Sequence, residues 1–186
     1  MKRMFDVIVS FVLLVVMALP MAVIAVLVKM DSPGPVLYWS RRVGRGNKIF
    51  LMPKFRTMAL GAPEVATHLL GDAEKHITPV GKCLRAASLD ELPQLWSVLT
   101  GEMSLVGPRP ALHNQEDLIA LRTEKGIDVL RPGITGWAQI NGRDDLPILQ
   151  KAAYDEYYLH HRSLRLDAKI LWRTLFKVIK KEGVAH

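Results

Sequence analysis

The sequence is poor in cysteine and has fewer acidic than basic residues. Its 186 residues include a single cysteine, Cys83, so an internal disulfide is excluded and no oxidising compartment is required. The 18 Asp and Glu are outnumbered by 25 Lys and Arg, a formal charge of +7, which favours an anionic partner such as nucleic acid, anionic lipid or a phosphorylated substrate. A chain of this length can bury one ordinary core without disulfide or metal.

Two common motifs are also missing. Gly81 and Lys82 resemble the end of a phosphate-binding P-loop, but His76 stands where that motif requires glycine and Cys83 where it requires Ser or Thr. The apolar N-terminal segment lacks a convincing cleavage site of small residues, which argues against a removed signal peptide. The sequence therefore favours retention of this segment as a membrane anchor.

Residues 7–28 form an almost entirely apolar run, long enough as a helix to cross a bilayer core. Cationic residues flank it on both sides, so charge gives no orientation and suits a hairpin whose ends share one face. Pro20 lacks an amide proton and predicts a kink. From the residues alone, a re-entrant helix and a straight spanning helix both stay open. We divide the chain into this membrane segment, 1–30, and the remainder, 31–186.

Beyond the apolar run the pattern changes to short mixed elements. The prolines and glycine of 31–35 end the helix. Residues 36–40 and 48–52 predict a small β-hairpin, and 64–70 a short helix. Lys54 and Arg56 flank Phe55 and predict either a phosphate or headgroup contact or a solvated strand end. From Leu164 onward, apolar and basic residues at helical spacing predict an amphipathic helix that lies in the headgroup plane or packs on the core.

The acidic pair Asp90 and Glu91 lies in a predicted helix over 85–99. Ser88 and Glu91 have the spacing of a capping box, and acids in a first turn also interact favourably with the helix dipole, so both acids have a structural explanation. Adjacent helical positions point about 100° apart, which suits two different ligands better than one facing acid–base pair.

Cations near this pair are candidate phosphate ligands. Arg109 stands between two prolines, which preorganise its guanidinium for bidentate phosphate binding. Arg85 precedes Asp90 by little more than a helical turn, with an ion pair to Asp90 or Glu91 as the structural alternative. Arg143 ends a second glycine-rich segment that also contains Trp137. A proline-rich turn around a buried tryptophan explains that segment almost as well.

Five motifs in chain order resemble the bacterial sugar transferases called monotopic phosphoglycosyl transferases: DSPGP (31–35), KFRTM (54–58), SLDELPQL (88–95), SLVGPRP (104–110) and RPGITGWAQ (131–139). The resemblance runs from the membrane segment to the final helix. It implies a mainly α (α+β) fold with a re-entrant helix broken at Pro20, a small β-hairpin, catalytic helices and amphipathic interfacial helices. Family members often have serine before that proline, where this chain has Leu19.

The resemblance also implies the chemistry. Asp90 would be the nucleophile that attacks the sugar-linked phosphorus of a UDP-sugar, and Glu91 would help to hold Mg²⁺. A covalent phosphosugar on Asp90 would form as UMP leaves, and polyprenol phosphate would then take the phosphosugar. Magnesium and the arginines at 85, 109 and 143 would lower the repulsion among the negative charges.

The expected function is the first membrane step of glycoconjugate assembly, on the cytoplasmic face of a bacterial inner membrane. The expected partners are a UDP-sugar, a polyprenol (undecaprenyl) phosphate and membrane lipids, but not nucleic acid; a homodimer is left open. The rivals are a basic nucleic-acid-binding module, a membrane scaffold, and a transferase that passes the sugar without its phosphate and so releases UDP. The sequence does not distinguish which sugar is carried.

Overall fold

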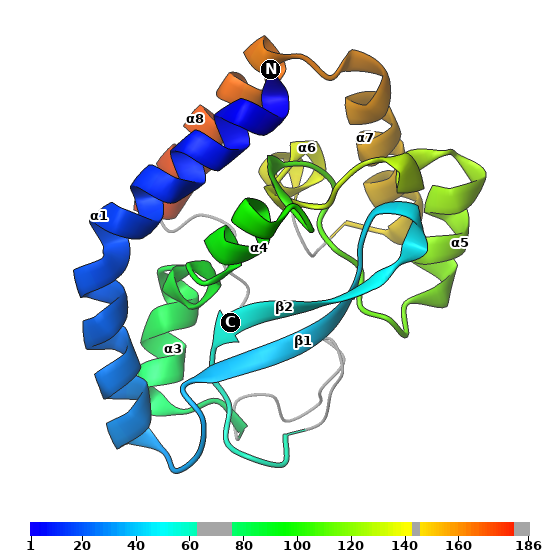
Figure 1. Ribbon diagram of the computed structural model, residues 1–186. Helices are drawn as coiled ribbons and strands as arrows, with labels where there is room; N and C mark the ends of the chain where they lie inside the picture. Colours follow the sequence, from blue (N-terminus) through cyan, green and yellow to red (C-terminus); the bar gives the residue numbers. More distant parts are fainter. Residues whose placement is uncertain (63–75, 143–145, 181–186) are drawn as a thin grey trace.

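The computed structural model describes residues 1–62, 76–142 and 146–180 of the chain. Most of this part is helical, and two small two-stranded sheets complete it (Figure 1). The mainly α character predicted from the sequence is therefore confirmed. The helix predicted over 64–70 and the side chain of Arg143 lie outside the described residues.

The apolar N-terminal run is helix α1, Lys2–Asp31. It is long and apolar enough to cross a membrane: its most hydrophobic 18-residue window has a mean hydropathy of 3.1, and only 11% of that window is buried. The helix is continuous across Pro20, so the predicted break of the helix at this residue is wrong. Figure 1 shows a change of direction part-way along α1 instead, because a proline removes one backbone hydrogen bond without having to end the helix.

The predicted β-hairpin is confirmed and is longer than expected. Strand β1, Leu37–Val43, pairs antiparallel with β2, Ile49–Phe55, and the turn between them contains the short 3-10 helix η1, Arg45–Asn47. Phe50 and Met52 of β2 are buried in one hydrophobic cluster, and Phe55 is buried in another. Lys54 follows Met52 by two residues and therefore lies on the same face of β2 as Met52.

The single helix predicted over 85–99 is wrong, because the chain divides it into three parts. Helix α3 covers Pro79–Ala86, the 3-10 turn η3 covers Leu89–Glu91, and α4 covers Gln94–Thr100. Ser88 adopts a left-handed conformation (φ 54°) and makes no side-chain capping bond, so the predicted capping box is not formed. Pro93 has no amide proton to continue a helix through this segment. Glycine at position 101, with φ 95°, ends α4.

The two glycine- and proline-rich segments meet in a second sheet. Strand β3, Ser104–Val106, pairs parallel with β4, Gly133–Thr135. A Cβ atom on Gly133 would lie 2.1 Å from the backbone nitrogen of Gly107, so no side chain fits there. The close approach that these glycines permit is therefore between two backbones of the protein itself.

The remaining helices are α5, Glu116–Glu124; η4, Ile127–Val129; α6, Trp137–Asn141; α7, Ile148–His161; and α8, Leu164–Lys180, which packs against both strands of this small sheet. Two hydrophobic clusters form the interior, and α1 contributes to both of them. Its first half packs Val9, Leu13 and Leu14 against the larger cluster, and its second half buries Ile24 and Val28 in the smaller one. Helix α1 therefore lies along the body of the protein.

The predicted amphipathic helix is α8, and part of its apolar surface packs on the core, as one of the two explanations expects. Ile170 is fully buried, and Leu166 and Leu171 pack against the core. Trp172 and Phe176, which are in edge-to-face contact, are exposed together with Leu175. One part of the apolar surface thus packs on the protein, and another part is open.

Candidate functional site: an acidic pair among cations

Asp90 and Glu91 lie in η3, at the corner where the chain passes from α3 to α4. The left-handed conformation of Ser88 turns the chain at this corner and separates the acids from the end of α3. The side chain of Asp90 is nearly buried, with 8% of its surface exposed, while Glu91 remains partly accessible. A tight corner thus holds two adjacent carboxylates in different surroundings.

Two cations from distant parts of the chain converge on Glu91. Lys54 Nζ, from β2, lies 2.9 Å from Glu91 Oε1, and Arg109 Nη2, from the segment after β3, lies 3.1 Å from the same oxygen. All three side chains are partly buried. Three of the sequence-predicted site residues are therefore brought together by the fold.

Arg85 reaches the cluster from the last turn of α3. Its Nε donates a hydrogen bond of 2.9 Å to Thr57 Oγ1, a residue that sequence reasoning did not select. Burial lowers the pKa of Arg85, and the negative charge of Asp90 partly offsets this effect. Arg85 is thus electrostatically coupled to Asp90. We name Lys54, Arg85, Asp90, Glu91 and Arg109 together the Asp90 cluster.

The surroundings of Asp90 partly oppose the charged form of its carboxylate. Burial raises the pKa of Asp90 above its ordinary value, and the neighbouring charge of Glu91 raises it further. Lys54 provides the largest opposing effect, and Arg85 and Arg109 also lower the pKa. A partly desolvated carboxylate beside three cations has the features of a reactive group that works on an anionic ligand.

Arg56 lies elsewhere, although it was grouped with Lys54 from the sequence. Its Nη2 donates to the Ser32 carbonyl at 2.7 Å and to Ser32 Oγ at 3.0 Å, and its Nη1 donates to the Pro33 carbonyl at 2.8 Å. The residue is 6% exposed. Arg56 thus fixes the linker that follows α1, which is a structural task. The predicted phosphate role of Arg143 lies outside the described residues.

The donor set suits a hard divalent cation only in part. Asp90 and Glu91 supply carboxylate oxygens, the ligands that Mg²⁺ prefers, and Mg²⁺ sites often use one or two carboxylates together with substrate phosphates. Within the described part of the chain, no group of three or more His, Cys, Asp or Glu side chains is placed to hold a metal by itself. The residues present therefore fit a magnesium ion that a phosphorylated substrate helps to bind.

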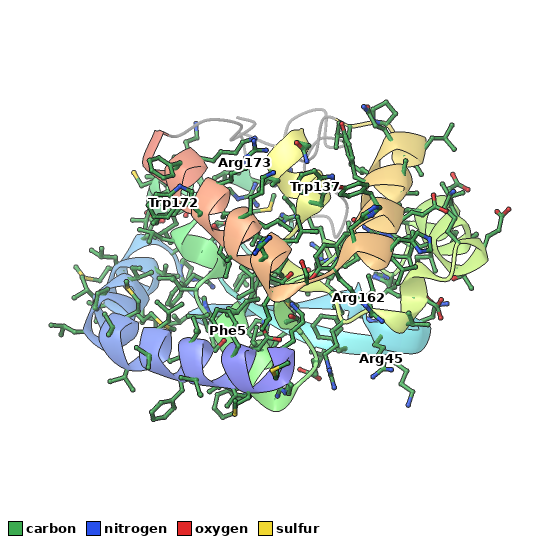
Figure 2. The ribbon with its side chains drawn as sticks, turned by 90° about the horizontal axis from the view of Figure 1, so that it is seen from above. Phe5, Arg45, Trp137, Arg162, Trp172 and Arg173 are labelled. Carbon is green, nitrogen blue, oxygen red and sulfur yellow. The ribbon has the colours of Figure 1, made fainter. Side chains whose placement is uncertain are left out.

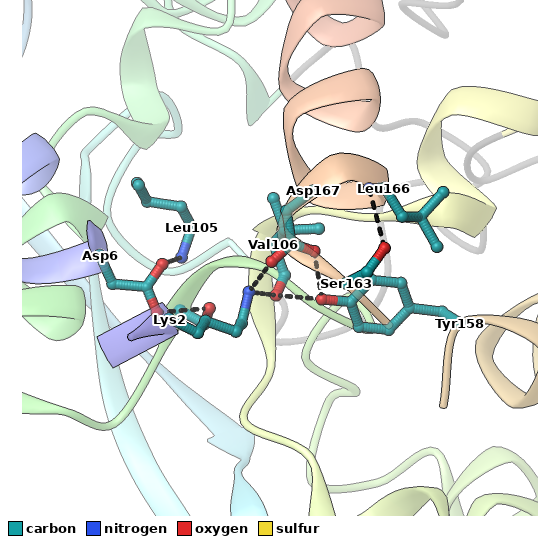
Figure 3. Close-up of polar contacts among 9 residues, drawn as sticks. Lys2, Asp6, Leu105, Val106, Tyr158, Ser163, Leu166 and Asp167 are labelled. Carbon is teal, nitrogen blue, oxygen red and sulfur yellow. Dashed lines mark hydrogen bonds and ion pairs between the residues drawn. The ribbon is translucent and has the colours of Figure 1, made fainter. Parts of the chain in front are cut away.

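Two further acids, Asp155 and Asp167, have structural partners. Asp155 Oδ2 accepts bonds of 2.6 and 3.0 Å from Arg122, which ties α7 to α5. Asp167 accepts bonds of 2.6 Å from both Tyr158 OH and Lys2 Nζ (Figure 3). These contacts support a structural role for both acids.

Figure 3 shows how the start of α1 is fixed to the rest of the protein. Besides bonding Asp167, Lys2 donates to the Val106 carbonyl, and Asp6 accepts from Ser104 Oγ and the Leu105 amide. We name Lys2, Asp6, Tyr158 and Asp167 the α1 anchor. Sequence reasoning treated Lys2 and Asp6 only as flanking charges. Their position beside an apolar helix was a signal, but their partners lie about 100 or more residues away.

The structure thus combines a long, largely exposed apolar helix, which indicates association with a membrane, with an acidic pair among cations. The chain matches the bacterial sugar transferase family over residues 1–181 and belongs to it. It is 40% identical to the uncharacterized sugar transferase EpsL of Bacillus subtilis, over 98% of this chain and 89% of that protein.

Relatives with assigned substrates are longer. The chain is 36% identical to a UDP-N-acetylgalactosamine-undecaprenyl-phosphate N-acetylgalactosaminephosphotransferase of Aeromonas hydrophila, over 98% of this chain and 44% of that protein. It is 37% identical to a UDP-glucose:undecaprenyl-phosphate glucose-1-phosphate transferase of Escherichia coli, over 95% and 39%. The chain thus spans less than half the length of these two relatives.

Proposed function

We propose that this protein transfers a sugar 1-phosphate from a UDP-sugar to undecaprenyl phosphate, with release of UMP, as the first membrane step of polysaccharide or glycoconjugate assembly. The observation that carries the proposal is the Asp90 cluster, in which a partly desolvated carboxylate sits beside three cations. The names of the Aeromonas hydrophila and Escherichia coli relatives supply the donor and acceptor classes.

In the proposed reaction, a carboxylate oxygen of Asp90 attacks the phosphorus that carries the sugar. The new O–P bond forms as the bond to the α-phosphate oxygen breaks, and UMP leaves with that electron pair. An oxygen of undecaprenyl phosphate then attacks the phosphorus, and the O–P bond to Asp90 breaks. The product is a diphosphate-linked sugar lipid, and the carboxylate is regenerated.

The cations have a defined task in this scheme. Phosphate oxygens and an attacking carboxylate repel one another, so the barrier falls when fixed positive charge lies where the negative charges meet. Lys54 and Arg109 lie on the Glu91 side of the pair, and Arg85 is coupled to Asp90. Glu91, with the substrate phosphates, would hold Mg²⁺, which would supply further neutralisation of phosphate charge.

We further propose that α1 is re-entrant, so that both of its ends and the Asp90 cluster share the cytoplasmic face. Two sets of polar contacts support this topology. At its start, the α1 anchor binds the helix to β3, α7 and α8. At its end, Asp31 accepts a bond from the Val80 amide of α3, and Arg56 fixes the following linker. A straight spanning helix would have to separate one end from these partners.

The exposed apolar surface supports the same placement at the membrane. Large side chains such as Phe11, Val15 and Leu19 are exposed on the face of α1 that points away from the core. Trp172, Leu175 and Phe176 add apolar surface on α8. Exposed apolar area of this kind is costly in water and is stable in contact with lipid.

The proposed activity is tested with purified protein in nanodiscs that contain undecaprenyl phosphate. The protein is incubated with Mg²⁺ and a panel of UDP-sugars that includes UDP-glucose, UDP-galactose and UDP-N-acetylgalactosamine, and the released nucleotide is identified by mass. We expect UMP with one or more donors. Release of UDP instead would assign transfer of the sugar without its phosphate and would overturn the proposal.

Covalent catalysis is tested in the same preparation without acceptor. We expect the intact protein mass to increase by one phosphosugar, and we expect Asp90→Asn to show no such adduct. An adduct of the same mass on the Asp90→Asn protein would place the nucleophile elsewhere.

The re-entrant topology is tested by replacing Pro20 with leucine. Leucine restores the hydrogen bond to the Val16 carbonyl and straightens the helix, so we expect an N-terminal tag to become accessible from the periplasm in a fraction of the molecules. Leu19→Ala serves as the matched control beside it. A tag that stays cytoplasmic in the Pro20→Leu protein would show that the anchoring contacts decide the topology without the proline.

A further inference from the structure

A second basic site lies beside the start of α1 and shares no residue with the Asp90 cluster. It is a cavity of about 190 Å³ between α1, β3, the segment after η4 and the junction of α7 and α8. Five cationic side chains line it, with Asp6 as the one carboxylate among the described lining residues: Lys2, Arg3, Arg45, Arg131 and Arg162. Arg45 and Arg162, both labelled in Figure 2, belong to this lining.

The positive charge of this cavity is only partly balanced inside the protein. Arg3 donates to the carbonyls of Val98 and Leu99, and Arg131 Nε donates to the Gly101 carbonyl. A carbonyl satisfies a guanidinium N–H but carries no net charge, so these bonds fix the arginines in place and leave their charge uncompensated. Lys2 differs, because it is paired with the Asp167 carboxylate.

Arg45 and Arg162 complete the cavity from its open side. Both residues are exposed, and they come from the hairpin turn and from the junction between α7 and α8. Guanidinium groups match phosphate oxygens with two parallel hydrogen bonds, and fixed and mobile arginines together can surround a single phosphate. The cavity has several times the volume of about 30 Å³ that one water occupies in the liquid.

The position of the cavity indicates which phosphate it meets. Lys2 and Arg3 belong to the first turn of α1, and the exposed apolar side chains of Met4, Phe5 and Ile8 follow directly. When these side chains contact acyl chains, the cavity lies at the depth of the lipid headgroups. A lipid whose tails lie against the start of α1 therefore presents its phosphate at the mouth of the cavity.

We propose that this cavity binds the headgroup phosphate of an anionic glycerophospholipid, such as phosphatidylglycerol, at a site separate from the Asp90 cluster. Binding there holds the start of α1 at the membrane surface and adds a specific contact to the general attraction between basic residues and acidic lipids. A soluble phosphate shares the headgroup chemistry but lacks the acyl chains that would contact Met4, Phe5 and Ile8.

The test counts retained lipids and does not depend on transferase activity. The full chain is placed in nanodiscs of phosphatidylcholine and phosphatidylglycerol in equal parts. The protein is then released from the nanodiscs, and the lipids that it retains are counted by native mass spectrometry. We expect wild-type protein to retain one phosphatidylglycerol molecule. The double variant Arg45→Gln/Arg162→Gln should lose about fivefold in retention for each arginine removed.

A matched double variant separates a site from diffuse attraction. Arg165→Gln/Arg173→Gln removes two exposed arginines of α8 that do not line the cavity, with the same change in net charge. We expect it to retain phosphatidylglycerol as wild type does. Equal losses in the two double variants, or unchanged retention in Arg45→Gln/Arg162→Gln, would overturn the proposal.

A competition experiment distinguishes the two sources of phosphate. Inorganic phosphate and UMP are added to the wild-type nanodiscs before release. We expect the bound lipid to remain, because neither anion gains the apolar contacts of the acyl chains. Displacement of the lipid by either anion at millimolar concentration would show that the cavity serves a soluble phosphate, and the lipid proposal would be wrong. The same lipid count can be made on an inactive Asp90→Asn protein, in which α1 and the cavity residues are unchanged. The outcome of the lipid test is therefore independent of whether transfer is observed.

Discussion

Two acidic clusters of this protein contain similar residues and differ in how their charges are satisfied. In the α1 anchor, Tyr158 donates to one oxygen of Asp167 and Lys2 donates to the other, both at 2.6 Å. Asp6 likewise accepts from a hydroxyl and a backbone amide. In the Asp90 cluster, Lys54 and Arg109 both bond to Glu91, and Asp90 is influenced by cations while burial opposes its charge.

This difference distinguishes acids with a structural role from an acid that can react with a substrate. Burial raises the pKa of Tyr158, and its hydrogen bond to Asp167 raises it further, so the phenol stays protonated and acts as a fixed donor. Burial raises the pKa of Asp90 as well, but there it keeps a carboxylate poorly solvated. A structural acid is thus surrounded by donors, whereas a nucleophile has to remain available to a substrate.

Replacing Asp90 with asparagine should cause the largest loss of activity and should raise the stability of the folded protein at neutral pH. We expect UMP release to fall on the order of a thousandfold or more, because the amide cannot act as the nucleophile. The folded state binds a proton at Asp90 more tightly than the unfolded chain does. The stability of the wild type therefore falls as the pH rises from the ordinary pKa of aspartate through the raised pKa.

Asparagine avoids this loss, so we expect the Asp90→Asn protein to have a higher midpoint of thermal unfolding than wild type at neutral pH. The gain should shrink as the pH is lowered below the ordinary pKa of aspartate, where both side chains are neutral. The measurement is thermal unfolding in one detergent across a pH series. A lower midpoint for Asp90→Asn at neutral pH would mean that the cations stabilise the Asp90 charge more than burial opposes it.

The matching change in the α1 anchor, Asp167→Asn, should reverse this pattern. It keeps the shape of the side chain and removes the charge that faces Lys2 and Tyr158, a loss of about 1.5–3 kcal/mol for hydrogen bonds to a charged group. For a chain of this size, that corresponds to a fall of roughly 3–12 °C in the thermal midpoint. We expect kcat per folded molecule to be unchanged. A fall in kcat without a fall in the midpoint would contradict the structural assignment of Asp167.

The same comparison shows what the sequence could reveal. Local patterns predicted the long apolar helix, the hairpin and the amphipathic C-terminal helix, because each rests on spacing within a few residues. The resemblance assigned Asp90 and Glu91 to the site, reasoning from charge and position added Lys54, Arg85 and Arg109, and the structure brings these five together.

The remaining features depend on contacts between distant segments. Arg56 looked like Lys54 in the sequence, yet it lies just beyond the end of β2 and bonds the linker at Ser32 and Pro33, whereas Lys54 bonds Glu91. Thr57 orients Arg85 across 28 residues of chain. The prediction of one helix over 85–99 was wrong because Ser88 adopts a left-handed conformation. A residue other than glycine gives no strong local signal for such a turn. Tertiary context overrides local pattern at such positions.

The smallest expected effect is a shift in the pH dependence of kcat/KM when a charge beside Asp90 is removed. Asp90 attacks as a carboxylate, so activity is present above its pKa and is lost as the pH falls through that value. Lys54 lowers the pKa of Asp90 more than any other cation does, and Glu91 raises it. We therefore expect the acid limb of the kcat/KM profile to move to higher pH in Lys54→Met and to lower pH in Glu91→Gln. Both are measured on residual UMP release at saturating Mg²⁺. Tyr158→Phe, which changes the α1 anchor alone, should leave the limb in place. Shifts of the same sign in Lys54→Met and Glu91→Gln would show that the acid limb does not report Asp90, because opposite charges beside one carboxylate must move its pKa in opposite directions.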